Sequence, residues 1–135
     1  MKRTYIDSGV LIAAARGSGE LAERALAVIS DNATRVYVSS DSVKSETIPK
    51  PTVFGRNEEV RFYEQFFSRV TTWVTFDRTH LENAFDEACN AGLSWVDAVH
   101  VIIAELSGCE ELVTAEKPSS AIHRTTRVRI ISIDC

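Results

Sequence analysis

The sequence predicts an α/β fold, a three-layer α/β/α sandwich with a mainly parallel central sheet of about five strands. Short runs rich in β-branched and aromatic residues alternate with longer stretches that have helical spacing. Strands that alternate with helices in this way are joined by right-handed crossovers, which place helices on both faces of the sheet. The 135 residues fit one domain, 1–135, which is long enough to bury a single core.

The expected strands are short runs containing Val, Ile, Tyr or Thr. They lie at residues 3–6, 35–38, 71–75, 111–114 and 128–133. Helices are expected between them. The first spans residues 20–32, with an apolar stripe from Leu21 to Ile29. A second follows the second strand and ends near Ile48, because Pro49 and Pro51 cannot continue it. Residues 52–56 are then expected to form a loop.

Three longer helices are expected in the second half of the chain. Residues 58–69 carry aromatic side chains at helical spacing, and residues 79–90 end before Gly92, a typical stop residue. Residues 94–107 form the third helix, which Gly108 ends. This last helix is apolar almost all round, so we expect it to be buried.

Composition excludes some classes of protein. The net charge of −4 argues against a protein that coats nucleic acid through phosphate contacts alone, although a bound metal would bring its own positive charge to a phosphate. No apolar run approaches the ~18 residues of a membrane span, and no signal peptide precedes the first strand. Cys89, Cys109 and Cys135 lack metal-type spacing, so we expect reduced thiols in a cytoplasmic protein.

Four acidic residues stand where apolar elements begin or end: Asp7, Glu46, Asp97 and Glu116. Asp7 and Glu116 follow strands, and Glu46 lies in the helix after the second strand. Ligands of parallel sheets bind outside the carboxyl ends of the strands, so topology predicts that these three share one edge. Asp97 follows a helix–helix connection, and topology alone does not place it there.

Each acid also has an ordinary structural interpretation. Asp7 precedes a helical run and can cap it. Glu46 can face solvent on its helix, and Glu116 can pair with Lys117. The set is more informative than its members, because carboxylates gathered at one edge repel each other unless a cation is present.

Asp97 has a specific alternative, since Ser94 three residues earlier resembles a capping box. A carboxylate on a buried helix nevertheless needs partners or a metal. His100 shares a face with Asp97 and is open to three interpretations: a bond to Asp97, orientation of a water molecule, or a satisfied core histidine.

A set of carboxylates favours Mg²⁺ or Mn²⁺, and such a site supports attack of water on a phosphodiester. Zinc is disfavoured because His80, His100 and His123 have no ligand spacing. The sequence contains neither a nucleophile elbow nor a Gly-rich phosphate loop.

In this order, residues 5–12, 40–46, 95–100 and 112–116 resemble the motifs of PIN domains, most closely the small prokaryotic proteins of the VapC type. The resemblance implies a PIN-like α/β/α fold and an acidic Mg²⁺ or Mn²⁺ site that cleaves RNA. It also implies a homodimer, and an antitoxin protein as partner if the chain is the toxin of a toxin–antitoxin pair.

The same resemblance implies that Asp7, Glu46, Asp97 and Glu116 are the catalytic and metal-binding residues of a metal-dependent endoribonuclease. The fourth position departs from the family, which usually has Asp there and often a second Asp shortly after. This departure favours an alternative hypothesis, a catalytically weak or inactive PIN-like module that acts through a protein partner. A small phosphatase is a third hypothesis.

Overall fold

The computed structural model describes residues 1–134 and contains one five-stranded sheet in the order β3-β2-β1-β4-β5. Every strand pair is parallel. The strands are β1 (Lys2–Ile6), β2 (Arg35–Ser40), β3 (Thr72–Val74), β4 (Glu111–Thr114) and β5 (Arg129–Ser132). The predicted parallel α/β fold is therefore confirmed.

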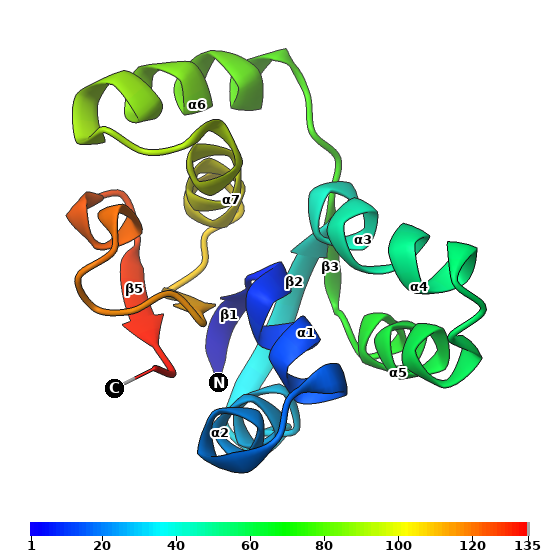
Figure 1. Ribbon diagram of the computed structural model, residues 1–135. Coiled ribbons are helices and arrows are strands. Elements are labelled where there is room, and N and C mark those ends of the chain that lie inside the picture. Colours follow the sequence, from blue (N-terminus) through cyan, green and yellow to red (C-terminus); the bar gives the residue numbers. More distant parts are fainter. Residues whose placement is uncertain (135) are drawn as a thin grey trace.

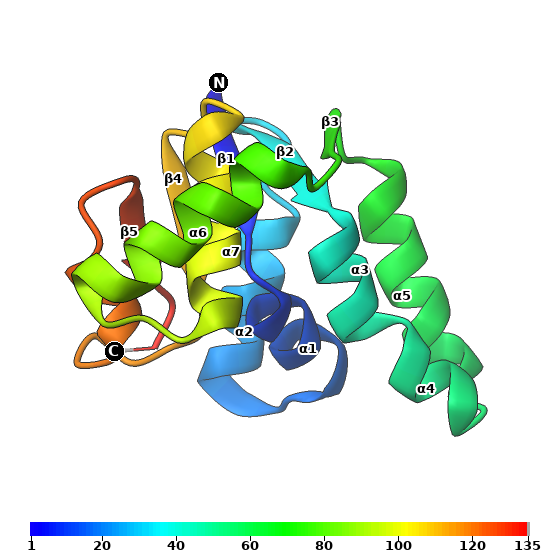
Figure 2. The ribbon, with the colours of Figure 1, turned by 90° about the horizontal axis from the view of Figure 1, so that it is seen from above.

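Helices cover both faces of the sheet. They are α1 (Ser8–Arg16), α2 (Gly19–Ile29), α3 (Asp41–Thr47), α4 (Pro49–Val53), α5 (Asn57–Ser68), α6 (Arg78–Ala91) and α7 (Trp95–Leu106), with a 3₁₀ turn η1 (Ala121–Arg124). Helices α6 and α7 pack together on one face and α1 and α2 on the other (Figures 1 and 2). None of these helices, within residues 1–134, is long and apolar enough to cross a membrane.

Two features of the first half differ from expectation. Residues 8–16 form helix α1, which the apolar pattern did not separate from its surroundings. The expected loop at 52–56 was wrong at its start, because α4 extends to Val53. Pro49 occupies the first turn of α4, where a missing backbone N–H costs nothing, so the proline ends α3 and begins the next helix.

Helix α7 lies at the centre of the core. All its residues from 98 to 104 are buried, as its all-round apolar pattern predicted. Gly92 before it has φ +69°, a left-handed conformation that glycine adopts without steric cost. The turn at Gly92 sets the direction in which α7 leaves α6, and so places the first turn of α7 beside the sheet edge.

Among the described residues, Cys89 and Cys109 are free, and the expected reduced state stays a prediction. Cys135 lies outside the described residues.

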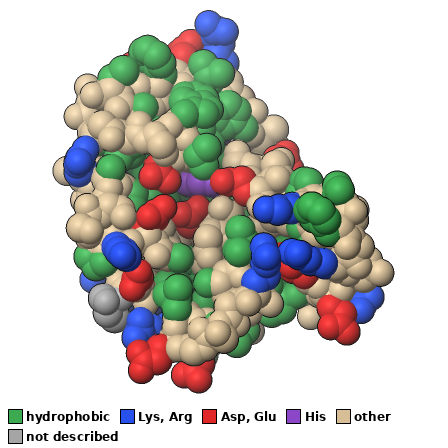
Figure 3. All heavy atoms as spheres, viewed as in Figure 1, with side chains coloured by type: hydrophobic (Ala, Val, Ile, Leu, Met, Phe, Trp, Pro, Cys, Tyr) green, Lys and Arg blue, Asp and Glu red, His purple; other side chains and the backbone are tan. Residues whose placement is uncertain are grey.

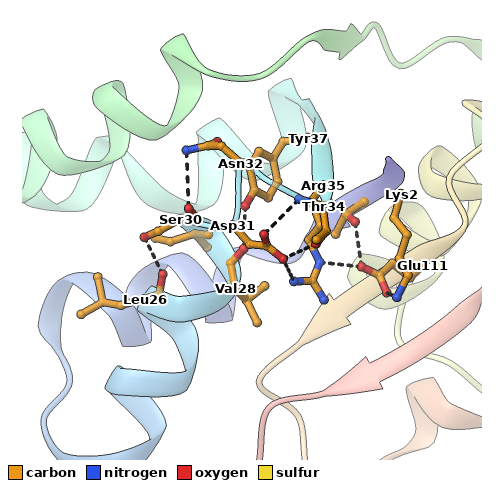
Figure 4. Close-up of polar contacts among 12 residues, drawn as sticks. Lys2, Leu26, Val28, Ser30, Asp31, Asn32, Thr34, Arg35, Tyr37 and Glu111 are labelled. Atoms are coloured by element: carbon orange, nitrogen blue, oxygen red, sulfur yellow. Dashed lines mark hydrogen bonds and ion pairs between the residues drawn. The ribbon is translucent and has the colours of Figure 1, made fainter.

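A buried ion pair joins three strands away from the predicted site. The Glu111 carboxylate accepts hydrogen bonds from Arg35 Nε at 2.8 Å and Thr4 Oγ1 at 2.7 Å (Figure 4). Lys2 Nζ lies 3.8 Å from the other carboxylate oxygen. Burial raises the pKa of Glu111, but these hydrogen bonds and positive charges outweigh it, so the pKa lies below its ordinary value.

We predict that Glu111→Gln lowers the free energy of unfolding by about 2–3 kcal/mol at neutral pH, because Arg35 loses its buried charged partner. A carboxylate whose folded pKa is depressed stabilises the fold above its unfolded pKa, and that contribution disappears as the pH falls through the folded pKa. Denaturant unfolding over a pH series should therefore show the two proteins converging in acid. A difference that is independent of pH would contradict this account.

Candidate active site

The four predicted acids line one cleft of about 330 Å³. Its lining consists of Asp7, Ser8, Gly9, Glu46, Val96, Asp97, Thr114, Ala115 and Glu116. Acidic side chains surround a histidine in a hollow of the surface (Figure 3). Three of the acids follow strand ends or lie in the helix after one, as topology predicted, and the turn before α7 brings Asp97 to the same place.

Asp7 both caps a helix and lines the cleft. Its Oδ1 accepts from the backbone N–H of Ser8 at 2.8 Å, and its Oδ2 accepts from Thr114 Oγ1 at 3.1 Å. The predicted capping role of Asp7 is therefore confirmed, and the same side chain also lines the cleft. The side chain ties the start of α1 to the end of β4, and with 7 % of its surface exposed it has little room to move.

Asp97 lies in the first turn of α7. Ser94 Oγ accepts from the backbone N–H of Asp97 at 3.2 Å, so the cap uses the main chain of Asp97 while its carboxylate lines the cleft. Burial raises the pKa of the Asp97 carboxyl, and the negative charges of Asp7 and Glu116 raise it further. The Asp97 carboxylate is thus close enough to those of Asp7 and Glu116 to be repelled by both.

His100 holds Glu46 rather than Asp97. Its Nε2 lies 2.5 Å from Glu46 Oε1 and 3.7 Å from Asp7 Oδ1, so one ring nitrogen sits between two carboxylates. Its Nδ1 lies 2.7 Å from Tyr5 OH, which is itself 2.9 Å from Ser40 Oγ. The ring is 1 % exposed, which makes it a fully partnered core histidine that orients an acid of the cleft.

The direction of these hydrogen bonds follows from the partners. A carboxylate only accepts, so His100 must carry a proton on Nε2. In the neutral ring, Nδ1 then accepts from Tyr5 OH, and Ser40 Oγ donates to the tyrosine oxygen. Sequence reasoning missed Tyr5 and Ser40, because a tyrosine in an apolar strand and a serine before a helix give no sign of a distant histidine.

Two buried groups of this cluster have shifted pKa values. Burial raises the pKa of Asp7, helped by the charge of Glu46 and opposed by His100 and Thr114. Burial lowers the pKa of His100, but the hydrogen bond to Glu46 and the charges of both carboxylates outweigh it, so the net shift is upward. The cluster concentrates negative charge and compensates part of it with the imidazole.

Glu116, the fourth acid of the cleft, has one side-chain hydrogen bond. Its side chain accepts from Ser120 Oγ at 3.2 Å, and its backbone N–H donates to Thr114 Oγ1 at 3.1 Å. Ser120, rather than the adjacent Lys117, is therefore its hydrogen-bonding neighbour. Within residues 1–134, no three His, Cys, Asp or Glu side chains converge closely enough to form a ready-made metal site. The acids share a cleft without meeting at a point.

The fold and the cleft define an α/β/α protein with an acidic site at the carboxyl edge of a parallel sheet. The model of the PIN domain family matches residues 4–121, so the chain belongs to the PIN domain family.

Solved structures agree at the level of the fold. VapBC2 from Rickettsia felis, bound to a DNA fragment from its promoter, aligns with a TM-score of 0.71 and 13 % identity over 96 % of this chain and 98 % of that one. DNA-bound VapBC from Salmonella typhimurium gives 0.71 and 17 %, covering 98 % and 99 %. VapC20 from Mycobacterium tuberculosis, a toxin that cleaves the sarcin–ricin loop, gives 0.69 and 16 %, covering 93 % and 98 %. No curated protein matches the chain in sequence.

We predict that Asp7→Asn stabilises the protein at neutral pH. An acid whose folded pKa is raised destabilises the fold once it ionises, so stability falls as the pH rises through the folded pKa. Asparagine keeps the oxygen that caps α1 and removes the charge. Thermal unfolding at neutral pH should show a Tm higher by on the order of 3 °C, or about 1 kcal/mol, with the gain vanishing in acid. A lower Tm at neutral pH would contradict the raised pKa of Asp7.

We predict that Tyr5→Phe costs about 2 kcal/mol of unfolding free energy, because it removes the hydroxyl that joins His100 to Ser40. The matched control is Tyr37→Phe, which loses a single bond to the carbonyl of Val28 and should cost about 1 kcal/mol. Chemical denaturation measures both costs, and ¹⁵N NMR of the imidazole should shift only in Tyr5→Phe. An unchanged His100 spectrum would refute the proposed chain of hydrogen bonds.

Proposed function

We propose that this PIN-domain protein is a metal-dependent endoribonuclease that hydrolyses RNA phosphodiester bonds, with Asp7, Glu46, Asp97 and Glu116 as its catalytic and metal-binding residues. The observation that carries the proposal is that four acids from four separate parts of the chain line one cleft. Burial and mutual repulsion raise the pKa of two of them, Asp7 and Asp97. Groups held against their own repulsion in a cleft are typical of functional sites.

The donor set fits a hard divalent cation. Carboxylate oxygens, with the hydroxyl groups of Ser8 and Thr114 beside them, are ligands that suit Mg²⁺ or Mn²⁺, which keep several waters and need few direct carboxylates. Asp7, Glu46, Asp97 and Glu116 would hold the ion. A bound ion supplies positive charge for the scissile phosphate and activates an attacking water.

The remaining side chains of the cleft position the acids. Thr114 fixes one oxygen of Asp7, and Ser8 fixes the other. His100 holds Glu46 through Nε2, with Tyr5 behind it. Carboxylates oriented by such hydrogen bonds lose little freedom when they bind an ion, which is the usual role of partners behind a metal ligand.

The binding partners of this chain are proposed from structures that share its fold. Two structures that share the fold are of DNA-bound VapBC proteins, and one from Klebsiella pneumoniae is described as a toxin–antitoxin complex. We propose that this chain is the toxin of such a pair, binds an antitoxin protein and forms a homodimer. A single PIN-like domain over 1–135 and a cytoplasmic location belong to the same proposal.

A catalytically weak or inactive binding module is the second candidate. The observation that favours it is Glu116, which is exposed, bonded to Ser120, and stands where the family usually has Asp. Calorimetric titration with Mn²⁺ separates the two candidates. Binding that is lost in Asp7→Asn supports the nuclease, whereas no binding at millimolar concentration supports the binding module.

We predict that Asp97→Asn lowers the rate of Mn²⁺-dependent RNA cleavage by on the order of 10²-fold or more, since removing one carboxylate takes away several kcal/mol of transition-state stabilisation. The matched control is Asp86→Asn, an exposed acid on α6 outside the cleft, which should cleave like wild type. Cleavage of a labelled RNA is followed with both variants purified in parallel, and circular dichroism checks that each is folded. Equal rates for wild type and Asp97→Asn would mean that the activity is a contaminant.

A further inference from the structure

A second, largely apolar cleft of about 340 Å³ adjoins the acidic one between α3 and α7. Phe76, Trp95 and Val96 give it apolar walls, and Ser42 and Ser45 contribute hydroxyl groups. Glu46 and Val96 line both clefts, so the two hollows adjoin and share a wall. Hydrophobic side chains gather on the surface next to the acidic cluster (Figure 3).

Trp95 is the notable residue of this cleft. It is the first residue of α7, two positions before Asp97, and its side chain remains 46 % exposed although the helix behind it is buried. Phe76 stacks on His80 with ring centroids 5.7 Å apart and an interplanar angle of 26°, so that wall is held in place. An exposed indole and a fixed phenyl ring that line the same cleft give it an apolar surface.

We propose that this cleft binds a nucleobase of single-stranded RNA, the base of a nucleotide that flanks the phosphate in the acidic cleft, with Trp95 as its stacking surface. The inference rests on the proposed function. Unpaired RNA bases are bound by stacking on aromatic side chains while polar groups contact their edges. Trp95 provides the aromatic face, and the hydroxyl groups of Ser42 and Ser45 provide edge contacts.

The shared wall of the two clefts favours a base over a protein partner. Glu46 and His100 line this cleft and also belong to the acidic cluster, so an occupant would lie next to a phosphate bound in the acidic cleft. In a bound RNA, the group next to that phosphate is the base of the same nucleotide. Asp41 is already engaged, because its Oδ1 accepts from Trp73 Nε1 at 3.0 Å, which leaves the serines to contact the base.

The test uses Trp95 emission. The chain has two tryptophans, so the emission of Trp95 is taken as the difference between Asp97→Asn, which prevents cleavage, and the same variant with Trp95→Ala added. Trp73 is kept because its indole holds Asp41. Both variants are titrated in magnesium buffer with a short oligoadenylate and with an abasic ribose-phosphate oligomer of the same length. We expect quenching and binding with oligoadenylate and much weaker effects with the abasic chain. Adding Trp95→Ala should weaken oligoadenylate binding by about tenfold or more, as measured by anisotropy of labelled oligomer.

Phe54→Ala is the matched control, since Phe54 is an exposed aromatic residue (63 %) that does not line either cleft. It should leave oligomer affinity unchanged. Equal quenching by the two oligomers, or no change of emission with either, would overturn the proposed base site. A protein partner would then be the remaining occupant of the cleft. The nuclease proposal is tested separately by RNA cleavage. If the wild type cleaves RNA and Trp95→Ala has the same KM, only the base site is refuted. If oligoadenylate quenches the emission but the wild type does not cleave RNA, only the nuclease proposal is refuted.

Discussion

The cost of keeping the carboxylates of Asp7 and Asp97 ionised in a partly water-excluded cleft is the constraint on which the site depends. Asp7 and Asp97 reach the cleft from a strand end and from a helix start, and the fold keeps them there although burial and neighbouring charge disfavour their ionised forms. The surrounding structure compensates with hydrogen bonds from Thr114 and Ser8 and with the imidazole of His100. Functional sites typically lower the stability of the fold locally, and interactions elsewhere in the structure offset the loss.

The pKa values of buried acids shift in opposite directions at the two ends of the sheet. At one end, Glu111 is buried with Arg35 and Thr4 as direct partners, and its pKa falls. At the other, burial raises the pKa of Asp7, and the charge of Glu46 raises it further. The first arrangement needs no ligand to be stable, whereas the second gains stability from any cation that binds it. This contrast distinguishes the two acids more clearly than burial does, since both are buried.

Much of the fold was predictable, because strand and helix periodicity and the stop residues Gly92 and Gly108 are local signals. Helix α1 and helix α4 were not separated from their surroundings, since α1 follows its capping Asp7 without a break and Pro49 acts as a helix start as readily as a stop. The placement of Asp7, Glu46 and Glu116 at one edge followed from parallel topology. The partnership of His100 with Tyr5 and Glu46 did not, because it joins residues distant in sequence through side-chain geometry that no local pattern encodes.

The most direct test of the central claim is a crystal of the wild-type protein soaked in Mn²⁺ and measured for anomalous scattering. The account predicts an anomalous peak in the acidic cleft, with oxygens of Asp7 and Asp97 among its ligands at roughly 2 Å. Clear density for the four acids with no peak among them, or a peak elsewhere on the surface, would contradict the claim that these carboxylates share an ion.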